Sequence, residues 1–191
     1  MRRRIATLVI VLLSALAPRS ARPVAMAAGA ADSSIYLPIV MRQVCDLNAY
    51  ETNIAERMRL DPQQQRLTLE CDPILARVAR ERALDMATRH YFGHTNPDGY
   101  GPNYLVRQAG YPLPSWYDAS PAGNNIESIA SGYSTPDAVW QGWMNSPAHR
   151  THLLGLVPFF AEQIDYGIGY VYDPASDYGH YWVVITARKE P

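Results

Sequence analysis

The sequence predicts an α+β domain in which helices come first and an antiparallel hairpin comes last. Helix-start signals, each a cap residue followed by proline, stand at Asp72-Pro73, Thr135-Pro136 and Ser146-Pro147. Near the end of the chain, segments 166–173 and 180–188 are rich in tyrosine, valine and isoleucine, alternate in polarity and are joined by turn residues. Helices and strands segregated along a chain in this way are typical of layered α+β domains.

The spacing of apolar residues and the helix-cap signals predict where the individual helices and strands lie in the sequence. The first helix is expected from about residue 44 to 59 and the second from 73 to about 89, because apolar residues recur in both at steps of three and four. A short helix is expected over 103–109, before Gly110. Further helices should begin at the two later proline signals, and a short strand near 126–130 should join the hairpin as a third strand. Trp140 and Trp143, three residues apart, are expected in the core.

The first 27 residues have the pattern of a secretory signal peptide. Three arginines at 2–4 precede an apolar run at 5–17, and Ala25-Met26-Ala27 supplies a small-x-small cleavage signal. The apolar run is shorter than the roughly 20 residues that a spanning helix needs. We therefore expect an exported protein, secreted or associated with the cell envelope, with no transmembrane segment after cleavage. Residues 28–43 are interpreted as a spacer and 44–189 as the domain.

The charge of the expected mature chain argues against nucleic acid as a partner. The whole chain has 17 basic and 18 acidic residues, and the five arginines of the first 27 residues leave 12 − 18 = −6. A phosphate backbone would be repelled on average, and no basic run offers a local patch. The chain is expected to act as a monomer on an extracellular ligand.

Cys45 and Cys71 are the only cysteines of the chain. In an exported protein, two cysteines most simply form one disulfide, and a metal site would need more ligands than this pair offers. The bridge would close a loop of 71 − 45 = 26 residues and would stabilise the fold by roughly 3–4 kcal/mol on the chain-entropy argument.

Several motifs together resemble one known family. YFGHTNPDGYGPN at 91–103, IESIASGYSTPDAV at 126–139, WMNSPAHR at 143–150 and the closing YGIGYVY and YWVV strands are similar to the bacterial branch of the CAP superfamily, also called SCP-like. The resemblance covers residues 46–188. It implies an α-β-α sandwich with a three-stranded antiparallel sheet between helical layers, and a central cavity lined by two histidines and acidic residues.

The resemblance assigns the cavity residues by motif. The histidines fall on His94 of GHTNPDG and His149 of SPAHR, and the first acidic position falls on Glu127. The glycine and asparagine that flank this glutamate in the family are Ile126 and Ser128 here. The second acidic position falls on Ser146, so the family's full set of four is incomplete. His180, at the start of the last strand, is a further cavity candidate, and His152 is expected to pack or to be solvated.

Two histidines and a carboxylate could do more than one kind of chemistry. His94, Glu127 and His149 could hold Zn²⁺ or another divalent cation with an open position for water, as some family members do. They could equally form a hydrogen-bonded polar cluster that orders the cavity wall. The sequence leaves these alternatives open.

The sequence lacks the motifs that usually mark the active site of a hydrolase. The chain has no H-E-x-x-H and no G-x-S-x-G segment, and proximity of Ser146 to His149 in sequence does not establish a nucleophile–base pair. We therefore expect a module that binds a lipid, glycan or peptide, with exposed aromatic residues around 100–117 adding contact area. A secreted metal-assisted hydrolase, such as a peptidase, is the first alternative, and a passive envelope-associated domain is the second.

Overall fold

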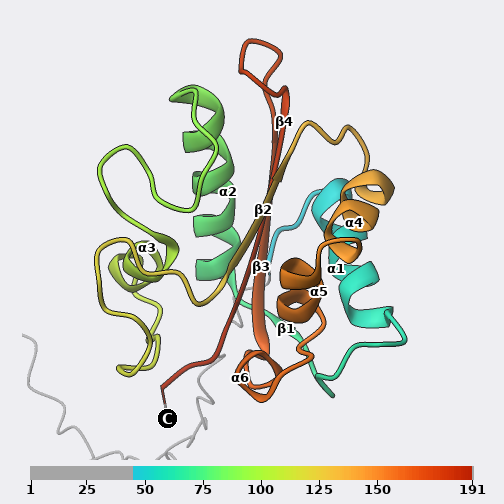
Figure 1. Cartoon of the computed structure of the whole chain (residues 1–191), viewed down its shortest axis with the longest axis vertical. Helices are drawn as coiled ribbons and strands as arrows, with labels where there is room; N and C mark the ends of the chain where they lie inside the picture. The colour runs from blue at the N-terminus through green and yellow to red at the C-terminus, as the bar shows by residue number, and fades with distance from the viewer. Residues whose placement is uncertain (1–44, 191) are drawn as a thin grey trace, which may run out of the picture. The chain divides into compact units, whose positions relative to one another are not determined.

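A computed structural model describes residues 45–190 of the chain. The expected signal peptide and nearly all of the spacer lie outside these residues. Among the described residues, no helix is both long and apolar enough to cross a membrane. The described part is an α-β-α sandwich, with a sheet seen nearly edge-on between two helical layers (Figure 1).

The sheet has four strands, one more than expected. Its spatial order is β1-β3-β4-β2, with the elements β1 (Glu70–Cys71), β2 (Glu127–Ser131), β3 (Asp165–Tyr172) and β4 (His180–Ala187). β2, β3 and β4 are the three antiparallel strands that the sequence predicts. The additional strand, β1, pairs in parallel with β3. Its two residues are too few to show an alternating pattern, so pairing with β3 rather than local sequence defines it.

Both faces of the sheet are buried, because side chains of β4 point alternately into two cores. Tyr181, Val183 and Ile185 pack on the face covered by α2 (Pro73–Thr88) and α3 (Pro102–Gln108). The opposite face carries Trp182 and Val184. There the covering helices are α1 (Ala49–Leu60), α4 (Pro136–Met144) and α5 (Pro147–Leu153) (Figure 1).

Helix α2 lies unusually close to the sheet, and glycines in β3 permit this. A Cβ atom at Gly167 would lie 2.1 Å from the carbonyl carbon of Leu75, and one at Gly169 would lie 2.2 Å from that of Ala79. Real Cβ atoms do not approach backbone so closely. The two glycines therefore let the backbone of α2 rest directly on β3.

The helix boundaries largely follow the predicted caps. Asp72 caps α2 by accepting from the amides of Ile74 and Leu75, and Thr135 caps α4. The first helix begins at Ala49, later than expected, because Asn48 and Glu51 form a capping box there. A short helix that was not predicted, α6 (Pro158–Ala161), follows α5. As expected, the two α4 tryptophans are buried in the core.

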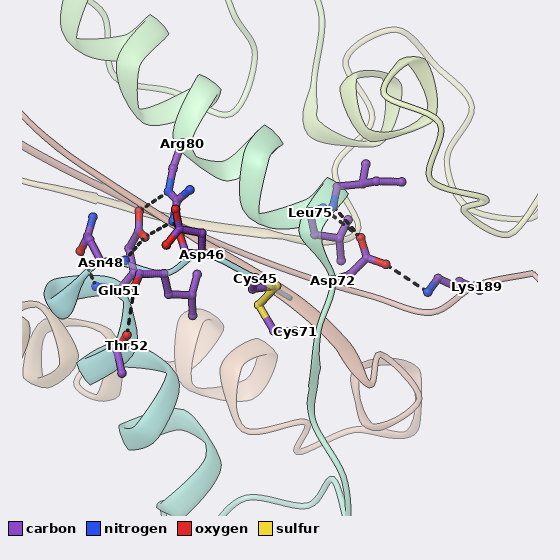
Figure 2. Close-up of a disulfide and its surroundings, with 12 residues drawn as sticks. Cys45, Asp46, Asn48, Glu51, Thr52, Cys71, Asp72, Leu75, Arg80 and Lys189 are labelled. Atoms are coloured by element: carbon purple, nitrogen blue, oxygen red, sulfur yellow. Dashed lines mark hydrogen bonds and ion pairs between the residues drawn. A yellow bond between two sulfur atoms is a disulfide. The ribbon is translucent and has the colours of Figure 1, made fainter. Parts of the chain in front are cut away.

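The predicted disulfide is present and ties the start of α1 to the edge of the sheet. Cys45 and Cys71 are bonded across 26 residues of sequence (Figure 2). Beside the bridge, the fully buried Glu51 of α1 accepts hydrogen bonds from Arg80 of α2 and from the backbone amide of Tyr170 in β3. Helix α1 is thus anchored by one covalent bond and by the ion pair of its buried Glu51 with the partly exposed Arg80.

Removing the disulfide should cost about 3–4 kcal/mol of unfolding free energy, because the reduced chain regains the entropy of an open loop of this length. We expect the Cys45→Ala/Cys71→Ala variant to shift its urea midpoint accordingly, measured by circular dichroism on residues 28–191. The native domain in excess reductant should show the same shift. A midpoint unchanged in both samples would contradict a stabilising role.

Candidate functional site

A cavity opens at the edge of the sheet where the two helical layers meet. Its volume is about 240 Å³. Three of the predicted residues converge on it from different elements: His94 from the loop after α2, Glu127 from the first position of β2, and His149 from α5. The other lining residues come from β2 and the segment before it, α5 and α6: Asn124, Asn125, Ile126, Ser128, Ala148, His152, Phe159 and Phe160.

Glu127 is held from both sides. Its carboxylate accepts from the Nε of Arg82 at 3.0 Å and from the His94 Nδ1 at 3.0 Å. Its side chain is fully buried, whereas that of His94 is 41% exposed. The glutamate therefore forms the buried base of the site, and His94 is its accessible part.

Arg82 is a residue of this site that the sequence motifs did not indicate. It is almost fully buried in α2 and also donates to the hydroxyl of Tyr91 and to the carbonyl oxygens of Gly93 and His94. Burial opposes its charge, but the Glu127 carboxylate and the Tyr91 hydroxyl together outweigh burial and raise the pKa of Arg82. Its position within the apolar stripe of α2 is the sequence feature that could have identified Arg82, because a charged residue in such a stripe is rarely buried without a partner.

The loop that carries His94 is fixed by these contacts. Arg82 binds its carbonyls from one side, and Asn96 closes a turn by accepting from the amides of Asp98 and Tyr100. The side chain of Asp98 in turn pairs with Arg89 at the end of α2. The turn-rich sequence after α2 therefore positions the imidazole of His94, as its composition suggests.

His149 and His152 lie on α5 but have different surroundings. His149 is half-buried, and burial together with nearby His94 lowers its pKa. His152 is buried between the hydroxyls of Ser128 and Thr186, each 2.7 Å from one of its ring nitrogens. Burial, with the charge of Arg66, lowers the pKa of His152 to about 3. Both imidazoles are therefore neutral at pH 7.

Arg66 fixes the end of α5. This buried guanidinium donates to the carbonyl oxygens of His152 and Leu153 at 2.8 Å and to that of Phe160 at 2.9 Å. Burial lowers its pKa to about 10, so it stays charged at pH 7. A cation at the carbonyl end of a helix is electrostatically favourable. Arg66 thus connects α5 and α6, which both supply walls of the cavity.

Two predicted site residues lie elsewhere. Ser146 precedes α5 as its N-cap and does not line the cavity. The ring of His180 stacks against that of Tyr172 at a centroid distance of 4.6 Å, and its Nδ1 is hydrogen-bonded to the Tyr170 hydroxyl. It belongs to the hairpin end of the sheet and is not among the cavity residues. The expected histidine pair is therefore His94 and His149, with His152 buried behind it.

The donor set only partly fits the predicted three-ligand metal site. Both oxygens of Glu127 already accept hydrogen bonds, from Arg82 and His94. Within residues 45–190, no three histidine, cysteine or acidic side chains are grouped closely enough to hold a metal ion. The imidazoles of His94 and His149 remain as possible metal ligands, and Glu127 would orient the ring of His94 through their hydrogen bond.

Fold and site together define the class of protein: an α-β-α sandwich with a histidine- and glutamate-lined cavity at the edge of its sheet. The profile of the cysteine-rich secretory protein (CAP) family matches residues 55–186, and the chain belongs to this family. It is 33% identical over 126 residues to the uncharacterized protein YkwD of Bacillus subtilis (strain 168). That match covers 65% of this chain and 44% of YkwD, so the chain spans less than half of its relative.

Solved structures share the fold. An outer surface protein from Borrelia burgdorferi superposes with a TM-score of 0.52 at 24% identity, covering 74% of this chain and 90% of that one. An extracellular protein containing a SCP domain from Bacillus anthracis str. Ames gives a TM-score of 0.51 at 25% identity. That match covers 73% of this chain and 39% of the other. The resemblance inferred from the motifs is thereby confirmed at the level of family and fold.

Proposed function

We propose that this chain is an exported CAP domain that binds an extracellular ligand in the cavity formed by His94, Glu127 and His149. The convergence of these residues, which come from three separate elements, carries the proposal. The cavity volume of about 240 Å³ is below the roughly 300–1,000 Å³ of pockets that enclose a whole drug-sized molecule. The cavity therefore takes an end group of a larger lipid, glycan or peptide.

A larger hollow of about 430 Å³ lies between α2, α3 and the loop that follows α2. It is lined by charged side chains that pair with one another, such as Arg77 with Glu81 and Arg89 with Asp98. A ligand there would have to displace existing ion pairs. Among the described residues, the smaller cavity instead offers imidazole nitrogens without a hydrogen bond or ion pair, namely the Nε2 of His94 and those of His149, and for this reason we prefer it.

Binding can be tested by titrating ¹⁵N-labelled residues 28–191 with a library of small alcohols, amides and acids while recording amide NMR spectra. We expect shifts concentrated at residues 124–128 and 148–149, and we expect them to be lost in the His94→Ala/His149→Ala variant. His90→Ala is the matched control, since His90 is exposed and pairs with Asp177 far along the chain. Shifts confined to the hollow between α2 and α3 would overturn the assignment.

A secreted metal-assisted hydrolase is the second candidate, and one observation favours it. The His94 Nδ1 bonded to Glu127 leaves Nε2 free, which is the arrangement of a histidine oriented for a metal by a carboxylate. Calorimetric titration of the domain with Zn²⁺ tests it. Saturable one-to-one binding that the double histidine variant loses would favour the metal site, and screens for hydrolysis would follow. A domain that binds neither zinc nor any fragment would instead be a passive envelope domain.

A further inference from the structure

Exposed aliphatic side chains are gathered at one end of the sheet, where β3 begins. Six large aliphatic residues are exposed within residues 45–190, and one of them, Leu84, lies on α2. The other five lie in the segments around β1 and α6, and we call them the aliphatic surface: Leu60, Leu67, Leu156, Val157 and Ile164. Single exposed apolar residues are normal on a protein, but a group of them marks an interaction site.

The segments that carry the aliphatic surface are in direct contact with one another. The amide of Gln65 donates to the carbonyl oxygen of Leu154 at 3.0 Å, and the amide of Glu70 donates to that of Ile164 at 2.9 Å. The loop between α1 and β1 therefore lies beside the α5–α6 connection and the start of β3, at the lower end of the domain in Figure 1. The five residues thus belong to one face of the molecule.

Buried Arg66 fixes the loop that displays Leu67. Its guanidinium binds carbonyl oxygens at the end of α5 and that of Phe160 in α6. Arg66 is 6% exposed, whereas the side chain that follows it, Leu67, is 102% exposed. Leu60, at the end of α1, is 78% exposed and lines the same hollow of about 320 Å³ as Leu67. Two leucines that contribute little to the core are therefore held out from an ordered scaffold.

The composition and shape of the aliphatic surface favour a lipid bilayer over a protein partner. The residues that dominate protein interfaces are tryptophan, tyrosine and arginine, whereas leucine and valine are under-represented. This surface consists of leucine, valine and isoleucine. A side chain that protrudes as far as Leu67 would need a matching pocket in a protein. Fluid hydrocarbon closes around any shape, and the gain from burying apolar area there is non-directional.

The charges beside the aliphatic surface indicate which kind of bilayer it fits. Arg59 and Asp61 flank Leu60, and Glu162 of the α6 end is paired with Arg188. Charges of both signs do not form the basic cluster that recognises anionic lipids. The expected mature chain, at 12 − 18 = −6, would moreover be repelled on average by an anionic surface. Phospholipids with neutral head groups therefore suit this face.

We propose that the aliphatic surface docks the domain on a bilayer of neutral phospholipids, with Leu60 and Leu67 inserted into the hydrocarbon. The chain is then a peripheral membrane protein that contacts the bilayer through the end of the domain where β3 begins. None of the five residues lines the cavity of His94, Glu127 and His149. Membrane docking is therefore independent of the function proposed above, and the two can fail separately.

Flotation of residues 28–191 with phosphatidylcholine vesicles tests the docking. The first 27 residues are omitted because their apolar run would itself enter a bilayer. We expect the wild type to partition onto the vesicles, and Leu60→Ser/Leu67→Ser to partition at least about tenfold less, because both leucines lose their transfer into hydrocarbon. Leu84→Ser, at the exposed leucine outside the surface, is the matched control and should partition like the wild type. Urea midpoints close to that of the wild type verify that both variants are folded.

The lipid composition and salt provide a second comparison. Replacing part of the phosphatidylcholine by phosphatidylserine should lower the partition, and added NaCl should not lower it on neutral vesicles, because salt screens charges and not apolar contacts. Partition that needs phosphatidylserine and is lost in salt would overturn the proposal, as would equal partition of the wild type and the double serine variant. A wild-type dimer, measured by light scattering, that the double variant dissociates would assign the surface to a second copy instead.

The orientation on the lipid has its own readout. Amide NMR spectra of the ¹⁵N-labelled protein are recorded in phosphocholine micelles with and without a spin-labelled lipid. We expect broadening concentrated at residues 60, 67, 156–157 and 164, with the amides around Leu84 unaffected. Broadening concentrated at the opposite, hairpin end of the sheet, residues 172–180, would overturn the assignment of this face even if the protein binds vesicles.

Discussion

Replacing Arg82 by methionine should lower the free energy of unfolding by about 3–5 kcal/mol, because the variant leaves a buried carboxylate without its partner. The side chain of Glu127 is fully buried, and Arg82 is its only ion-pair partner other than His94 in residues 45–190. Methionine fills a similar volume, so the loss reflects charge and hydrogen bonds rather than a cavity. Urea unfolding followed by circular dichroism measures it.

Two further variants test whether the loss of stability in Arg82→Met comes from the buried ion pair. Arg77→Met, at an exposed position of the same helix, should cost less than about 1 kcal/mol, as surface ion pairs do. Arg82→Met/Glu127→Leu should recover much of the loss, because neither charge then remains buried. Equal losses in Arg82→Met and Arg77→Met would show that the buried pair is not the source of stability.

Acid should destabilise the domain through His152 by about 4 kcal/mol between pH 6.5 and 3, of which about 3 kcal/mol should appear by pH 4. The unfolded chain takes up a proton on this histidine below its ordinary pKa of 6.5, whereas the folded protein does so only at a pKa of about 3. In this window the unfolded state binds more protons, so lowering the pH favours it. The stabilisation is present above pH 6.5 and is lost as the pH falls.

The measurement compares unfolding free energies at pH 7 and pH 4 in the wild type and in His152→Asn. The variant cannot take up this proton, so the difference between wild type and variant should shrink by about 3 kcal/mol on going to pH 4. Other carboxylates contribute equally to both proteins and cancel. A parallel pH dependence in wild type and His152→Asn would contradict the prediction.

Local sequence signals were sufficient to predict most of the fold. A cap residue followed by proline, before a run of apolar residues at helical spacing, predicted two helix starts, and Asp72 and Thr135 cap α2 and α4 as predicted. Alternating apolar residues predicted β3 and β4, and the pair of cysteines predicted the disulfide. The motifs also named the three residues that meet at the cavity, because their spacing reflects the family fold.

Tertiary structure decided what depends on distant partners. The strand β1 exists because Glu70 and Cys71 pair with β3, about a hundred residues later in the chain, and two residues carry no pattern of their own. Arg82 and Glu127 lie 45 positions apart, so their ion pair could not be found from local spacing.

The surroundings of the histidines were likewise decided by tertiary structure and not by local sequence. The sequence favoured His180 over His152 as a cavity residue, whereas His152 is among the cavity residues and His180 is not. Only the fold places His152 between two buried hydroxyls and His180 among tyrosines at the hairpin end. The sequence by itself thus determined most of the elements and named His94, Glu127 and His149, which line the cavity. Packing between elements decided their protonation, their partners and the chemistry that the cavity offers.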